Sequence, residues 1–140
     1  MESETGASSI SDRRHEKLIA GIGTQFKEIL DGSRQSVYIY LDDLHKVCNR
    51  NFASLLGYRS PKEWSDVKEN FPNVFVARKS QQILISAYQD AVTKFIGSTI
   101  EVTWKRKDGT EVKSTTILVP IEYDGHAMAL HYVDAAVRPK

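Results

Sequence analysis

Two Asp-Gly pairs divide the last third of the 140-residue chain into three strand-like runs. The runs cover residues 99–107, 110–122 and 126–133. Asp108-Gly109 favours a tight hairpin between the first two runs, and residues 123–125 turn the chain into the third. Consecutive strands joined by such short turns pair in antiparallel fashion. The sequence therefore predicts an antiparallel meander at this end of the chain.

Two further strands are predicted in the first half of the chain. Residues 36–42 alternate aliphatic side chains with Tyr38 and Tyr40, which is a strand pattern. A short turn leads to a second strand over residues 45–48. Together with the C-terminal runs, these segments predict a sheet of five strands.

Helical spacing of apolar residues appears in two places. One stripe lies within residues 11–31, which we interpret as a flanking helix that follows a disordered polar tail at residues 1–10. The other lies within residues 78–95 and predicts the longest helix of the domain.

Short helices are expected between the second strand and this long helix. Asn49 or Asn51 can cap the first of them, and Gly57 can end it in a left-handed conformation. Ser60 and Glu63 form a capping box for the next one. The element order predicts an α+β domain over residues 32–134, followed by a C-terminal tail at 135–140.

Composition limits the classes of function. Charged residues make up 26% of the chain and the net charge is only +1, which argues against a nucleic-acid-binding surface. No apolar run is long enough to span a membrane, and the acidic start is not a secretory signal, so we expect a cytoplasmic protein without membrane contact. Cys48 is the only cysteine, which excludes an internal disulfide.

Two segments, in this order, resemble the PAS domain family, a group of sensory and dimerisation modules. Residues 49–58 read NRNFASLLGY, and residues 105–111 read KRKDGTE. The resemblance covers about residues 29–134. It implies a profilin-like five-stranded antiparallel sheet with helices on one face and an N-terminal flanking helix. It also implies signal transduction, as in two-component systems, through an output module such as a histidine kinase or a transcription regulator.

The chain departs from the family pattern before the long helix, where residues 75–78 lack the common His-Pro-x-Asp signature. Asp134 matches the residue that the family places at the exit to a signalling helix.

The resemblance implies that a small-molecule ligand would lie between the helices and the inner face of the sheet. Side chains alternate along strands, and we assign the even-numbered residues of the last three strands to that inner face. Buried hydroxyls of Ser114 and Thr116 need partners, which could be a ligand, water or backbone. The aromatic residues could clamp a ligand or form plain core. The candidate ligand-binding residues are Ile39, Phe52, Leu56, Leu84, Tyr88, Trp104, Ser114, Thr116, Leu130 and Tyr132.

The outer face of the predicted sheet carries an apolar patch, and the flanking helix carries an apolar stripe. Either the helix covers the patch within one chain, or two chains join through these surfaces. We expect a homodimer. The candidate interface residues are Leu18, Ile22, Phe26 and Ile29 on the helix, with Ile117, Val119 and Ile121 on the sheet.

The sequence names no cofactor. We expect no metal site, because His126 and His131 are five apart on one strand and so face opposite sides. The resemblance implies no haem, because haem-binding members of the family commonly use a histidine on the long helix, which has none here. It also implies no photoactive flavin, because the reactive cysteine of light-sensing members lies on a helix further along the domain, whereas Cys48 precedes the first short helix.

Catalytic motifs are absent from the sequence, so we predict no catalytic residue and no enzyme. The alternative is a small cavity-bearing α+β enzyme, isomerase-like, with Asp42, Asp43 or Glu101 as the base. Such an enzyme needs a carboxylate with a raised pKa inside the cavity.

Overall fold

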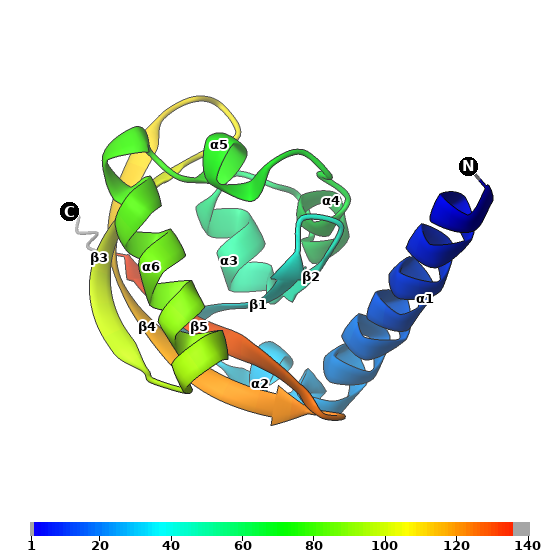
Figure 1. The fold of residues 1–140 in the computed structure, drawn as a ribbon. Coiled ribbons are helices and arrows are strands. Elements are labelled where there is room, and N and C mark those ends of the chain that lie inside the picture. Colours follow the sequence, from blue (N-terminus) through cyan, green and yellow to red (C-terminus); the bar gives the residue numbers. More distant parts are fainter. Residues whose placement is uncertain (1, 136–140) are drawn as a thin grey trace.

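The chain folds around one antiparallel sheet of five strands, in a computed structural model that describes residues 2–135 (Figure 1). The strands lie in the order β2-β1-β5-β4-β3. This architecture confirms the predicted α+β class. The elements are α1 (Glu2–Gln25), α2 (Lys27–Gly32), β1 (Ser36–Asp42), β2 (His45–Cys48), α3 (Arg50–Leu55), α4 (Pro61–Ser65), α5 (Phe71–Phe75), α6 (Arg78–Lys94), β3 (Ser98–Lys105), β4 (Glu111–Tyr123) and β5 (His126–Ala135).

Asn49 joins the first strand to the first of the short helices. Its buried side-chain oxygen accepts hydrogen bonds from the backbone amides of Val37 and Phe52, each at 3.0 Å. Its amide group donates to the backbone oxygen of Gln35 at 2.9 Å. Asn49 therefore caps α3 and holds that helix against β1 at the same time.

The capping box predicted at Ser60 is present. The hydroxyl of Ser60 accepts from the amide of Glu63 at 3.0 Å, and the Glu63 carboxylate accepts from the amide of Arg59 at 2.6 Å. The same carboxylate pairs with Lys107 at 2.8 Å. This pair links α4 to the β3–β4 hairpin.

Three helical features differ from the sequence predictions. The flanking helix α1 includes residues 2–10, which the sequence assigns to a polar tail. It ends at Gln25, and α2 follows as a separate helix. Helix α5 was not predicted, because five residues around Pro72 are too few to show a helical period. Residue 1 and most of the predicted C-terminal tail, residues 136–140, lie outside the described residues.

The turn between β4 and β5 corrects the predicted faces of the last strand. Only Asp124 and Gly125 form the loop, with φ of 53° and 75°, because Tyr123 pairs with His126. The sequence analysis had placed residue 123 in the loop as well. Pairing one residue further along reverses the face of every side chain on β5.

Consequently β5 presents its odd-numbered residues to the inner face. His131 lies opposite Leu118, and Val133 lies opposite Thr116. The even-numbered residues Leu130 and Tyr132, which the sequence analysis placed on the inner face, lie on the outer one together with Met128.

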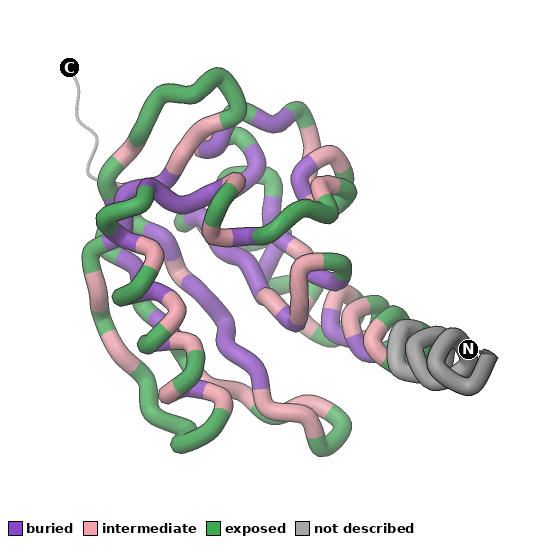
Figure 2. The backbone as a smooth tube through the Cα atoms, turned by 45° about the horizontal axis from the view of Figure 1, so that its top comes forward, coloured by how far each residue is buried: buried purple, intermediate pink, exposed green. Residues whose placement is uncertain are grey.

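Helices cover both faces of the sheet. Helices α3 to α6 cover the inner face around an aromatic core that includes Trp64, Trp104 and Phe75. Helices α1 and α2 cover the β1–β5 half of the outer face, where Leu18 and Ile22 are buried. Figure 2 shows the buried residues concentrated along the strands and on the helix segments beside them.

The β4 part of the outer face is more open than the part under α1. Ile117 is 40% exposed and Val119 is 37% exposed. Much of the predicted helix stripe is therefore covered within the chain, whereas part of the predicted sheet patch faces outward. No helix within residues 2–135 has the length and apolar character to cross a membrane.

Replacing Ile22 with Ala should lower the free energy of unfolding by about 2–5 kcal/mol, because the fully buried side chain joins α1 to the sheet. The matched control is Ile29→Ala, whose side chain is 38% exposed and should cost about 0.5 kcal/mol. Urea denaturation of both variants measures the difference. Equal effects would show that the contact of α1 with the sheet contributes little to stability.

Candidate ligand-binding site

A cavity of about 220 Å³ lies between the inner face of the sheet and helices α5 and α6. Its walls are aromatic and aliphatic, with few polar groups and no charged side chain. The lining residues are Tyr38, Tyr40, Phe71, Pro72, Leu84, Ile85, Tyr88, Gln89 and His131.

Strand β1 supplies two tyrosines to this cavity, because its inner face carries Tyr38 and Tyr40. The ring of Tyr38 stacks on that of His131, with ring centres 4.0 Å apart and planes 9° from parallel. The hydroxyl of Tyr40 donates to the Asp43 carboxylate at 2.9 Å. The same carboxylate oxygen accepts from the amide of Phe71 at 3.0 Å, which fixes the start of α5 against the end of β1.

Tyr88 extends from α6 toward the same strand. Its hydroxyl donates to the backbone oxygen of Tyr40 at 3.4 Å, and the two rings meet edge to face with centres 5.3 Å apart. Burial, helped by the charge of Asp42, raises the pKa of Tyr88 to about 12. The tyrosine is therefore uncharged at neutral pH.

His131 is the most unusual polar residue at the cavity. It is 1% exposed, and burial lowers its pKa to about 3, although the backbone of Ala129 and Tyr38 opposes part of this effect. Its ring is therefore neutral at physiological pH. Among residues 13–135, whose side chains the structure describes, the buried Nδ1 of His131 has no hydrogen-bond partner.

Of the candidate ligand-binding residues predicted from the sequence, Leu84 and Tyr88 line the cavity. Phe52 and Leu56 belong instead to the fully buried inner core.

Three other candidates form a closed hydrogen-bond network beside that core. The indole of Trp104 donates to the hydroxyl of Ser114 at 2.8 Å. That hydroxyl donates to the backbone oxygen of Val102 at 3.0 Å and lies 3.0 Å from the hydroxyl of Thr116. Protein groups thus satisfy the hydroxyl of Ser114, and these three residues do not line the cavity.

The remaining candidates, Ile39, Leu130 and Tyr132, lie on the outer face with α1 and not at the cavity. Ile39 pairs with Leu130, so the β1 register places both on the same side. The sequence analysis missed His131 for the same reason. The Asp124-Gly125 pair favours a two-residue loop. Assuming that loop length would have placed His131 on the inner face of the sheet.

Sequence comparison gives no relatives: no family model matches the chain, and no curated protein matches it. Solved structures do match its fold. A PAS domain from Colwellia psychrerythraea has a TM-score of 0.62 at 18% identity and covers 81% of this chain and 96% of its own. A PAS domain from a two-component sensor histidine kinase has a TM-score of 0.59 at 9% identity, covering 83% and 98%.

Vibrio cholerae VqmA, described among LuxR-type receptors and solved as a dimer without target DNA, has a TM-score of 0.59 at 7% identity, covering 83% of this chain and 53% of its own. VqmA bound to DPO also has a TM-score of 0.59 at 7% identity, covering 80% and 56%.

The chain has the PAS fold. In this fold, the cavity lies between helix α6 and strands β1 and β5. The sequence segments that resembled the family form α3 and the β3–β4 hairpin.

Lowering the pH should destabilise this domain through His131. The folded-state pKa of about 3 lies below the ordinary 6.5, so the unfolded chain binds the extra proton between these values and stability falls with the pH. We expect a loss of about 2 kcal/mol in the free energy of unfolding between pH 7 and pH 5 relative to His131→Phe, which keeps a ring but cannot titrate. Urea denaturation at both pH values measures it, and identical pH dependence of the two proteins would contradict the assignment.

Proposed function

We propose that this chain is a sensory PAS module that binds a small, uncharged ligand in the cavity bounded by α5, α6, β1 and β5. Occupancy of the cavity would regulate a linked or partner output module. The observation that supports this proposal best is the uncharged cavity at which a buried polar atom of His131 has no partner among the described residues.

The cavity chemistry favours one class of ligand. An unsatisfied buried polar group costs about 1–3 kcal/mol, so a ligand that hydrogen-bonds His131 would gain binding energy there. The neutral ring of His131 and the neutral hydroxyl of Tyr88 favour an uncharged ligand. At about 220 Å³ the cavity is smaller than the pockets of about 300–1,000 Å³ that hold drug-sized ligands. We therefore propose a small planar molecule with one or two polar groups.

The identity of the output rests on the structural neighbours. One neighbour is a PAS domain from a two-component sensor histidine kinase, and another, VqmA, is described among LuxR-type receptors and has been solved bound to DPO. We propose by analogy that the output of this module is a histidine kinase or a transcription regulator, and that the module acts in the cytoplasm.

We also propose that the module is not an enzyme. The carboxylates considered as catalytic bases do not line the cavity. Burial by itself would raise the pKa of Asp42, but hydrogen bonds from His15 and His45 outweigh it and hold the pKa below its ordinary value. Glu101 is exposed on β3. A base with a raised pKa inside the cavity, which the isomerase-like alternative requires, is therefore not found among the side chains of residues 13–135.

Filling the cavity should abolish ligand binding. Leu84 lines it from α6, and Leu84→Trp should fill it, whereas the neighbouring Ile83 is 46% exposed and does not line it. We expect amide NMR shifts near Tyr88 and His131 when neutral aromatic compounds, such as indole and phenol, are titrated into the wild type and into Ile83→Trp. Leu84→Trp should show none of these shifts.

Native mass spectrometry of the freshly purified chain supplies the complementary measurement, because it detects a ligand retained from the cell. A wild type that retains no ligand and responds to none of the compounds would instead indicate a pure interaction module.

We further propose that the module forms a homodimer through the open part of its outer face. Phe26 and Ile121 are only partly buried against the residues that pack between α1 and the outer face of the sheet. The side chains of Ile29, Ile117 and Val119 are exposed. Burying such apolar surface stabilises an association by about 25 cal/mol per Å². Leu18 and Ile22 would support the interface from beneath, because they already pack on the chain's own sheet.

Replacing Val119 with Asp should convert the dimer to a monomer, because the charge would face the partner's apolar surface. Its stability as a monomer should change by no more than about 1 kcal/mol, since the position is exposed on the strand. The control is Ile83→Asp, an exposed apolar residue on α6, which should stay dimeric. Analytical ultracentrifugation measures the oligomeric state of the wild type and of both variants. A wild type that is monomeric at all concentrations would refute the proposed dimer.

A further inference from the structure

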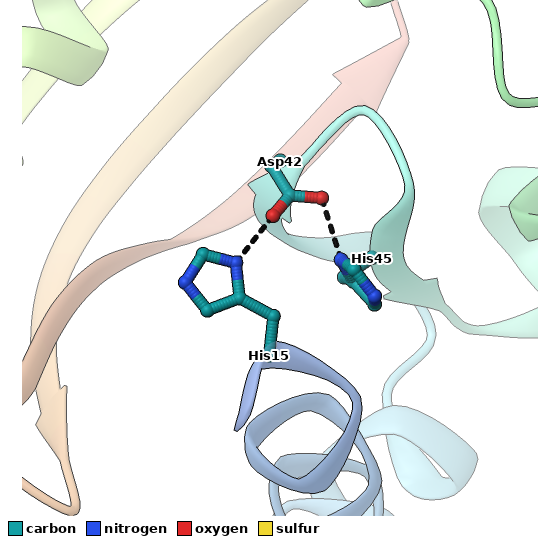
Figure 3. Close-up of side chains that lie close together, drawn as sticks. All are labelled: His15, Asp42 and His45. Atoms are coloured by element: carbon teal, nitrogen blue, oxygen red, sulfur yellow. Dashed lines mark hydrogen bonds and ion pairs between the residues drawn. The ribbon is translucent and has the colours of Figure 1, made fainter. Parts of the chain in front are cut away.

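Three potential metal ligands meet where α1 passes the turn between β1 and β2 (Figure 3). Nδ1 of His15 lies 2.5 Å from one carboxylate oxygen of Asp42, and Nδ1 of His45 lies 2.8 Å from the other. Ligand atoms of the three residues all lie within 4.8 Å of one another. This cluster belongs neither to the cavity nor to the proposed dimer surface.

The fold holds these residues together from distant parts of the chain. His15 comes from α1, Asp42 ends β1 and His45 begins β2. The second oxygen of Asp42 is held further by the amide of Leu44 at 2.9 Å, so the carboxylate is oriented before any ion arrives. His45 is buried, whereas the side chains of His15 and Asp42 are 25% and 35% exposed, which leaves a path from solvent.

A third histidine lies beside the cluster. The ring of His126, at the start of β5, is centred 5.5 Å from that of His15. Sequence analysis paired His126 only with His131, which lies on the opposite face of the sheet. The fold instead gathers His126 with His15 and His45.

We propose that His15, Asp42 and His45 form a binding site for a divalent transition-metal ion, of which zinc fits best, with a water molecule as the fourth ligand. Zinc prefers four ligands of the imidazole and carboxylate kind at about 2.0–2.2 Å in a tetrahedron. Ligand atoms around such an ion lie about 3.3 Å apart, so the present separations of 2.5 and 2.8 Å would have to widen only slightly.

Binding exchanges protons for the ion. The ionised carboxylate of Asp42 can only accept, so the two ring nitrogens that face it carry protons in the hydrogen-bonded state. The metal would take the place of these protons, which pass to solvent or, by a change of tautomer, to the other ring nitrogen. Without a metal the same residues form a partly exposed hydrogen-bonded cluster.

A bound metal ion would attach the flanking helix α1 more firmly to the turn between β1 and β2. His15, Leu18 and Ile22 are three and four residues apart, so they lie on one side of α1. Leu18 and Ile22 already pack on the outer face of the sheet. A metal at His15 would extend the attachment of α1 by one turn toward its N-terminus. Metal binding would thus strengthen the attachment of α1 to the sheet.

The test uses the full chain after removal of metals with EDTA, titrated with zinc against a chromophoric chelator. We expect one zinc ion per chain, confirmed by native mass spectrometry. His15→Ala should weaken binding by at least about 100-fold, since even residues that only support a ligand typically matter by 10–100-fold. Asp31→Asn is the matched control, because Asp31 is an exposed carboxylate paired with Lys27, and it should bind zinc like the wild type.

Two further measurements distinguish a specific metal site from non-specific zinc binding to the protein surface. Cobalt bound in place of zinc should show the visible absorption of a tetrahedral ion in the wild type and not in His15→Ala. Zinc should also slow amide hydrogen exchange in residues 13–25 of the wild type only. His15→Ala removes a partly exposed side chain and should remain folded, as circular dichroism can verify. The proposal is overturned if the wild type binds zinc no more tightly than His15→Ala, which would leave a hydrogen-bonded cluster alone.

Discussion

The two-residue turn at Asp124-Gly125 is the constraint on which the rest of the structure depends. Both residues adopt positive φ, and the turn lets Tyr123 pair with His126. That pairing sets the register along all of β5, which lies at the centre of the sheet between β1 and β4. It turns His131 toward the cavity and Leu130 toward α1. With a loop of one more residue, the two side chains would lie on the opposite faces of the sheet. His131 would then no longer line the cavity, and Leu130 would no longer pack against α1.

Strand β1 is the element that the two proposed sites share. Tyr38 and Tyr40 point to the cavity, and the alternating Ile39 packs under α1. At the end of the strand, Asp43 binds the hydroxyl of Tyr40 and the neighbouring Asp42 binds His15. Asp42 and Asp43 are joined by one peptide bond, so a movement of Tyr40 that displaces Asp43 would also act on the contact between Asp42 and His15 of α1. This adjacency offers a short physical route between a ligand in the cavity and the flanking helix.

The inner core shows why the cavity lies over β1 and β5 and not over β3 and β4. Trp104, Ser114 and Thr116 satisfy one another, and Phe52 and Trp64 fill the remaining space with aromatic contacts. Close packing of this kind leaves no room for a second molecule. Between α6 and β1 a cavity remains, and there Nδ1 of His131 has no hydrogen-bond partner among residues 13–135.

The sequence by itself determined the elements that local physics controls. The Asp-Gly hairpin, the Ser60 capping box and the apolar period of α6 each depend on residues a few positions apart, so the strands, the long helix and the α+β class could be predicted. Tertiary structure alone decided which distant side chains meet. His15 and Asp42, which meet in the fold, are 27 residues apart in the sequence. The face on which His131 lies depends on the register of β5, which changes with a single residue in the turn before it. Local patterns carry no information about such encounters, because the same alternation fits either face until the neighbouring strands fix it.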